Sequence, residues 1–267
     1  MSVILDLVPP FETSDQMKEI PYETVALQEL QEWKTKMRKA PTRLNHLAAT
    51  MQKTVNRYIP EKVHQALTST IKQMVRAVLF GSERTSGKPA VPASLEELET
   101  KVRASIRFYQ TTAAAEGGIT GAGGILLGLA DIPLLLSLKL KMLFDIATYY
   151  GYSVEDYKER LYLLHIFQLA FSSQAQRTAV FRQMENWESK KHQLPDDIHL
   201  FDWRTFQQEY RDYIDLAKMA QLIPVIGAPV GAVVNYKLIQ KLGQYAMNAY
   251  RLRWQERQLL PENPTNL

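Results

Sequence analysis

The sequence predicts an all-α protein: a multi-helix bundle of about eight helices, with two glycine-rich apolar helices packed at its centre and amphipathic basic helices at its periphery. Apolar residues recur at three- and four-residue intervals in several windows, as they do on one face of a helix. No stretch shows the sustained alternation and turn dipeptides of β-strands. With 46% hydrophobic residues in a chain of 267, there is enough apolar material for a real core.

The N-terminal region, 1–92, is expected to hold amphipathic helices. Pro21 opens the first helix, which ends before Pro41. Its apolar stripe is Ala26, Leu30, Trp33 and Met37. Residues 43–80 form either two helices or one helix broken at Pro60. The basic face of this segment carries Arg43, Lys53, Arg57, Lys62, Lys72 and Arg76. A linker at 81–93, rich in glycine, serine and proline, is expected to be mobile.

A helical core is expected over 94–257, followed by a tail at 258–267. Ser94 and Glu97 form a capping box that starts a helix running toward the glycines at 117. Asp131 is placed to cap a helix from Ile132 to Tyr150, which ends at Gly151.

The rest of this core is expected to hold four helices. Ser153 and Asp156 start a helix that reaches at least Phe171, and a further helix spans 174–190. Asp202 caps a helix from Arg204 to Leu222, and the last helix runs roughly from Pro229 to Arg257.

Composition and charge exclude several classes of function and indicate where the protein is basic. The absence of cysteine excludes disulfides, thiol nucleophiles and Cys-ligated metal clusters, and it fits a reducing compartment. The N-terminus lacks the pattern of a signal peptide, so a cytoplasmic location is expected. The net charge is only +4, but residues 1–32 contain seven acids and one lysine, whereas 33–92 contain twelve Lys/Arg and two acids. A basic surface is therefore expected on the second of these segments.

The glycines in two apolar segments are the most informative pattern. Their spacing in the first segment places Gly117, Gly121, Gly124 and Gly128 on one narrow stripe of a helix, and the second segment contains Gly227 and Gly231. Each glycine in a helix costs about 1 kcal/mol relative to alanine, so aligned glycines imply a close approach by another backbone or a lipid chain. Three readings remain open: a helix crossing in a soluble core, contact with the membrane, or an irregular loop. A phosphate-binding loop is excluded because neither the preceding strand nor the Lys-Ser/Thr pair is present.

Asp131 is the one charged residue in the run 117–138, which is just long enough to cross a bilayer. Pro133 and the glycines weigh against a simple span. Asp131 is read as a helix cap or a buried, hydrogen-bonded carboxylate, with a polar site in an apolar environment as the alternative.

No catalytic motif is recognised. The five histidines show no ligand spacing on one helix face, so no metal or other cofactor is expected, and a metal bound by the Asp196–His199 loop is the weaker alternative. Ser172 and Ser173 are read as ordinary helix residues because no nucleophile elbow is present. The tyrosines around Gly151 suit a membrane interface and a half-buried helix surface equally well. Nucleic-acid binding is disfavoured because the basic segment has few aromatic residues and no known recognition motif.

Three stretches resemble the EcsC family, named for a bacterial protein encoded beside an ABC transporter. They are YETVALQELQEWK at 22–34, ITGAGGILLGLADIPLLLSLKLKMLFDIATYYGY at 119–152 and LIPVIGAPVGAVVNYKLIQKLGQYAMNAYR at 222–251. The stretches occur in the family's order and cover about a third of the chain. The resemblance implies an all-helical, membrane-associated protein, and it carries over no catalytic residues.

The function predicted from these observations is binding without catalysis at the inner face of the cytoplasmic membrane. The partner would be membrane lipid or a membrane protein such as a transporter, with Lys53, Arg57, Lys62, Lys72 and Arg76 attracting anionic head groups. A soluble protein-protein interaction module is the first alternative. A lipid-acting enzyme with an unrecognised site is the second. The sequence makes no prediction of oligomeric state.

Overall fold

The computed structural model describes residues 21–39, 61–80, 94–121, 132–202, 204, 206 and 228–259. These residues form eight α-helices and two short 3₁₀ helices and contain no β-strand, which confirms the predicted all-α bundle. The α-helices are α1 (Tyr22–Arg38), α3 (Glu61–Phe80), α4 (Leu95–Gly121), α6 (Ile132–Tyr149), α7 (Tyr157–Phe171), α8 (Gln174–Met184), α9 (Trp187–Lys190) and α12 (Ala228–Leu259). The 3₁₀ helices are η1 (Lys191–Gln193) and η2 (Ile198–Leu200).

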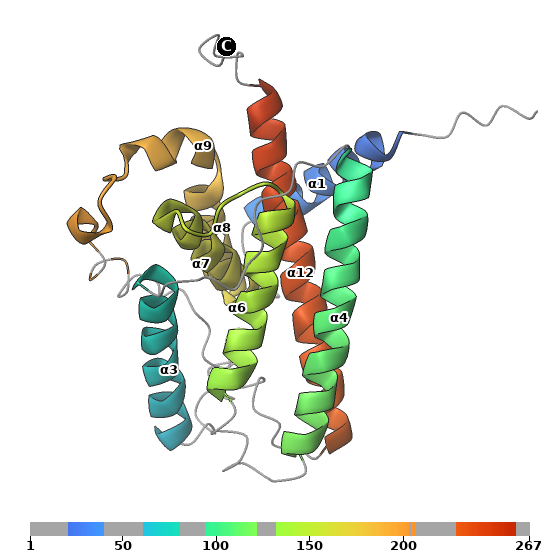
Figure 1. Ribbon diagram of the computed structural model, residues 1–267, viewed down its shortest axis with the longest axis vertical. Helices are drawn as coiled ribbons and strands as arrows, with labels where there is room; N and C mark the ends of the chain where they lie inside the picture. Colours follow the sequence, from blue (N-terminus) through green and yellow to red (C-terminus); the bar gives the residue numbers. More distant parts are fainter. Residues whose placement is uncertain are drawn as a thin grey trace, which may run out of the picture.

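The long helix α12 is the centre of the bundle. It packs against α1, α4, α6, α7 and α9 (Figure 1). Its contact with α4 is antiparallel, since Arg251 near one end pairs with Glu99 and Gly243 further down faces Ile106. Helices α4, α6 and α12 therefore stand side by side, with the end of α4 next to the starts of the other two (Figure 1).

Helix α1 follows the predicted apolar stripe. Ala26, Leu30, Trp33 and Met37 are all buried. They face α8 and α12, and the Trp33 ring meets Phe181 edge-on at 5.3 Å between centroids. The stripe works because three- and four-residue spacing keeps all four side chains on one side of the helix.

Helix α3 is amphipathic and packs on α6 and α7 at the flank of the bundle (Figure 1). The side chains that it buries are Ile71, Met74, Val75 and Val78. Lys72 and Arg76 are exposed on the other face. The part of the predicted 43–80 segment before residue 61 lies outside the described residues.

Several helix ends form as their capping residues predict. The Ser94 hydroxyl accepts a hydrogen bond from the Glu97 amide at 3.1 Å. The Asp156 carboxylate caps α7 by accepting from the Lys158 amide at 2.9 Å. Gly151 has a φ of 82°, which ends the turn after α6 in a conformation that glycine adopts at low cost.

Two local expectations are wrong. The single helix predicted over 174–190 is two helices, because Asn186 adopts a left-handed conformation (φ 56°, ψ 36°) between α8 and α9. Asparagine tolerates this region better than most residues, and the Asn186 amide donates to Glu256 of α12 at 2.8 Å. Ser172 and Ser173 do not lie inside a helix: Ser172 ends α7 and Ser173 caps α8.

Candidate functional site

The predicted glycine stripe is described only in part. Gly117 and Gly121 lie in the last two turns of α4, and Gly231 lies in the first turn of α12. Gly124, Gly128, Gly227 and Asp131 lie outside the described residues, as does most of the helix predicted over 204–222. Packing of the two glycine-rich segments against each other therefore stays a prediction, although the helices that carry their described glycines are neighbours.

The predicted lipid-contacting cations are also described in part. Lys72 and Arg76 are exposed on α3, and Lys62 lies in the first turn of the same helix. Lys53 and Arg57 lie outside the described residues.

Exposed apolar side chains lie at the starts of the two helices that follow the glycine segments. Six large hydrophobic side chains are exposed among the described residues, and three of them lie at the starts of α6 and α12. These three are Leu134, Val233 and Tyr236, which are 54%, 53% and 40% exposed. We call this region, together with Gly117, Gly121 and Gly231, the glycine-bearing end.

Two polar residues, Lys139 and Asn235, are buried near the starts of α6 and α12. Lys139 of α6 is fully buried, and its Nζ lies 3.4 Å from the carbonyl of Leu135. Asn235 is buried, and its Oδ1 has no hydrogen-bond partner among the described residues.

Burial changes the protonation of Lys139. The loss of solvation lowers the pKa of its ammonium group from 10.5 to about 7, and the negative charge of Glu116 on α4 opposes this shift only partly. Lys139 therefore changes charge near neutral pH inside the bundle. Sequence reasoning missed Lys139 because it is followed closely by Lys141. Two lysines so close together suggest the exposed, polar end of an apolar segment.

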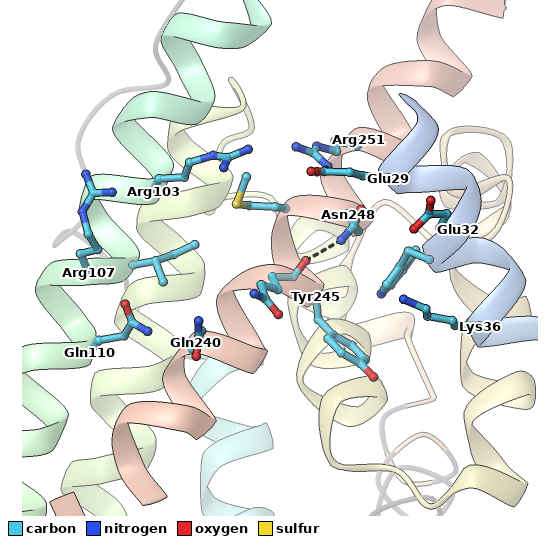
Figure 2. A pocket seen from close by; sticks show the side chains of 14 residues that line it. Glu29, Glu32, Lys36, Arg103, Arg107, Gln110, Gln240, Tyr245, Asn248 and Arg251 are labelled. Carbon is cyan, nitrogen blue, oxygen red and sulfur yellow. Dashed lines mark hydrogen bonds and ion pairs between the residues drawn. The ribbon is translucent and has the colours of Figure 1, made fainter. Parts of the chain in front are cut away.

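A polar groove of about 490 Å³ lies between α1, α4 and α12. Arg103, Arg107 and Gln110 come from α4 on one side, Glu29, Glu32 and Lys36 from α1 on the other, and Gln240, Tyr245, Asn248 and Arg251 from α12 between them (Figure 2). The groove is large enough for a small organic ligand. Its charged groups were not singled out from the sequence, because three separate helices bring them together.

Two arginines of α12 form buried ion pairs on opposite sides of that helix. The Arg251 guanidinium binds Glu99 of α4 through two hydrogen bonds of 2.6 and 2.5 Å. Arg253 binds Glu159 of α7 and Glu188 of α9, each at 2.6 Å. Residues two apart on a helix point about 200° apart, so the two arginines tie α12 to helices on both sides.

Tyrosines complete these ion pairs. Tyr150 donates to Glu99 at 2.9 Å, and Tyr250 donates to Glu159 at 2.5 Å. The Arg253 guanidinium lies 3.6 Å from the ring centroid of Tyr152. Burial raises the pKa of Tyr150 and Tyr250 well above the ordinary value, which keeps their hydroxyls protonated and able to donate. Tyr150 and Tyr152 thus belong to the core rather than to an exposed interface, whereas Tyr149 is partly buried.

The acids in this network have a different role from the one their positions suggest. Glu159, in the first turn of α7, reads from the sequence as a residue that complements the helix dipole, but it is buried and paired with Arg253. Burial alone would raise the pKa of Glu188, yet Arg253 and Lys191 together lower it below its usual range. Both carboxylates are therefore structural ion-pair partners.

Both aspartates of the Asp196–His199 loop bind other groups of the protein. The Asp196 carboxylate pairs with Lys158 at 2.7 Å, and the Asp197 carboxylate accepts from the His199 amide at 2.8 Å. In the described part of the chain, no three His, Asp or Glu side chains gather in a way that could hold a metal ion. Over the same residues, no helix is long and apolar enough to cross a membrane.

The fold and these features define an α-helical bundle protein in which a central helix is fixed by buried ion pairs and flanked by a polar groove. A sequence model of the EcsC protein family matches residues 24–254, and the chain belongs to this family.

Two proteins of Bacillus subtilis (strain 168) are similar to the chain. "Protein EcsC" is 45% identical over 228 residues, which cover 85% of this chain and 94% of that protein. "Uncharacterized protein YdbA" is 30% identical over 141 residues, about half of each chain. No solved structure matches the chain.

Proposed function

We propose that this protein is a non-catalytic binding protein at the inner face of the cytoplasmic membrane, which contacts the bilayer through the glycine-bearing end. The single observation that supports this best is the exposure of Leu134, Val233 and Tyr236 at the starts of α6 and α12. Apolar side chains in such a position gain free energy by entering the lipid interface, at about 25 cal/mol per Å² removed from water.

The low charge of the segment 117–138 and the exposed cations of α3 also support a membrane contact at this end of the bundle. The segment 117–138 carries one charged residue, and it begins and ends within helices at this end of the bundle. Exposed Lys72 and Arg76 lie on α3, beside α6 (Figure 1). Each such cation near an anionic lipid surface contributes about 1 kcal/mol. The contact is therefore apolar at the glycine-bearing end and electrostatic along α3.

Vesicle flotation tests this proposal. The protein should float with vesicles containing phosphatidylglycerol more than with neutral vesicles, and added salt should reduce the difference. Leu134→Asp combined with Val233→Asp should lower the floated fraction at least fivefold. Leu200→Asp, which changes an exposed leucine in η2, is the matched control and should float like the parent protein.

Three outcomes would count against the proposal. Equal flotation with neutral and anionic vesicles at low salt would remove the electrostatic part. Flotation unchanged by the double substitution at 134 and 233 would remove the glycine-bearing end as the contact. A protein that stays unbound to every vesicle favours the alternative of a soluble interaction module.

A further inference from the structure

The groove between α1, α4 and α12 holds charged groups that the fold leaves unused. Arg107 on the α4 side and Glu32 on the α1 side form no side-chain hydrogen bond or ion pair with any other described residue. Their neighbours differ in this respect: Glu29 is held by Arg251, and Arg103 donates to the Tyr22 hydroxyl at 2.9 Å. Among the described residues, the groove thus offers unpaired charged groups of both signs, with Arg107 on α4 and with Glu32 and Lys36 on α1 (Figure 2).

Buried polar atoms lining the same groove also lack partners. Trp33 is only 7% exposed, and its Nε1 has no hydrogen-bond acceptor among the described residues. Asn248 donates to the Gln244 carbonyl at 3.0 Å, but its buried Oδ1 accepts nothing from them. A buried polar group without a partner costs about 1–3 kcal/mol, so two beside one groove indicate a ligand that supplies hydrogen bonds.

The arrangement of charge restricts that ligand. Four cationic side chains (Lys36, Arg103, Arg107 and Arg251) and two acidic ones (Glu29 and Glu32) line the groove, and since Glu99 neutralises Arg251 from behind, the net excess is one positive charge. Arg103 and Arg107 are four residues apart on α4 and so lie on one face, where two guanidinium groups can bind a phosphate through paired hydrogen bonds. Glu32 on the opposite side suits an ammonium group.

We propose that this groove binds a zwitterion in which a phosphate is joined to an ammonium group, with the phosphate at Arg103 and Arg107 and the ammonium at Glu32. Glycerophosphoethanolamine has this chemistry, both as a soluble compound and as the polar part of phosphatidylethanolamine. The volume of about 490 Å³ accommodates a molecule of this size. The inference is independent of the membrane proposal, because a soluble compound suffices to test it.

Isothermal titration calorimetry with the full chain tests the inference. Glycerophosphoethanolamine should bind, and glycerol phosphate or ethanolamine alone should bind at least tenfold more weakly. Arg107→Gln and Glu32→Gln should each weaken binding at least tenfold. The matched controls are Arg182→Gln and Glu96→Gln, which change exposed residues outside the groove, and they should bind like the parent protein.

Three results would overturn the zwitterion site. These are no binding of glycerophosphoethanolamine, equally tight binding of glycerol phosphate, or binding that neither groove variant changes. Circular dichroism melts of Arg107→Gln and Glu32→Gln should match the parent, because neither side chain pairs with the rest of the described structure.

Flotation with vesicles distinguishes the two sources of the ligand, a lipid head group and a free metabolite. If the ligand is a lipid head group, Arg107→Gln should also reduce flotation with phosphatidylethanolamine vesicles. If it is a free metabolite, that flotation should be unchanged while the calorimetric binding is lost. The double substitution at Leu134 and Val233 should lower the floated fraction at least fivefold and leave calorimetry unchanged, so that failure of the membrane proposal is distinguished from failure of the groove.

Discussion

Arg251 and Arg253 show how single residues determine the position of the central helix. Each guanidinium is almost fully buried and meets carboxylates from other helices at 2.5–2.6 Å. Taking such ions out of water is costly, and the ion pair only roughly offsets that cost. Their stronger effect is on specificity, since a rotated or shifted α12 would leave a charge buried without a partner.

The buried Lys139 leads to a prediction about how the free energy of unfolding depends on pH. Its pKa is about 7 in the folded chain and near 10.5 when unfolded, so between these values the unfolded chain holds more protons. The free energy of unfolding should therefore rise with pH in this window, by up to about 1.4 kcal/mol per pH unit. Below pH 7 both states are protonated, and the full penalty for burying the charge applies.

Lys139→Met should remove this dependence. Urea denaturation at pH 7, 8 and 9 should show the variant to be more stable than the parent at pH 7, with the gap closing as pH rises. Lys141→Met is the control on the same helix, because Lys141 is partly exposed and pairs with Asp145. If the parent and Lys139→Met have the same slope against pH, the buried lysine does not titrate in this range.

At the scale of elements, α4 and α12 come close together at a glycine outside the predicted stripe. A Cβ added to Gly243 would lie 2.7 Å from two side-chain atoms of Ile106. Ile106 is buried and β-branched, so its side chain has little freedom to move. The principle that a helical glycine marks a close contact thus applies in α12, at a position that the glycine-rich segments did not indicate.

Gly243→Ala should therefore destabilise the protein. An exposed helical site would gain up to about 1 kcal/mol from this change, whereas overpacking costs about 1–3 kcal/mol. Thermal melts should place Gly243→Ala below the parent. In an Ile106→Ala background, where the contacting atoms are gone, the same substitution should raise the melting temperature. Stabilisation in both backgrounds would show that the helices separate easily at this point.

The elements divide into those that local pattern predicts and those that it does not. Helix α1 was predicted because its four apolar residues and its flanking prolines act within one helix. The break at Asn186 was not, because it depends on a contact with Glu256 about seventy residues later. Arg251 and Arg253 were not singled out from the sequence for the same reason, because the acids that pair with them come from other helices. The groove residues could not be predicted from local pattern either, because they come from three separate helices.

At the scale of the whole molecule, the bundle has two distinct ends. The buried ion pairs lie toward the C-terminal end of α12, where they hold five helices together. The glycine-bearing end has exposed apolar side chains and a titratable lysine beneath them. The proposed membrane contact would place the glycine-bearing end against lipid and the other end in water.

Site-specific fluorescence on vesicles tests this orientation most directly. Because the chain has no cysteine, Val233→Cys and Gln258→Cys can each be labelled at a single position with an environment-sensitive dye. The two exposed positions lie about 38 Å apart along α12 at 1.5 Å per residue. On anionic vesicles with brominated acyl chains, the dye at 233 should shift to the blue and be quenched, and the dye at 258 should do neither. Equal quenching at both positions, or quenching at 258 alone, would contradict the proposed membrane contact.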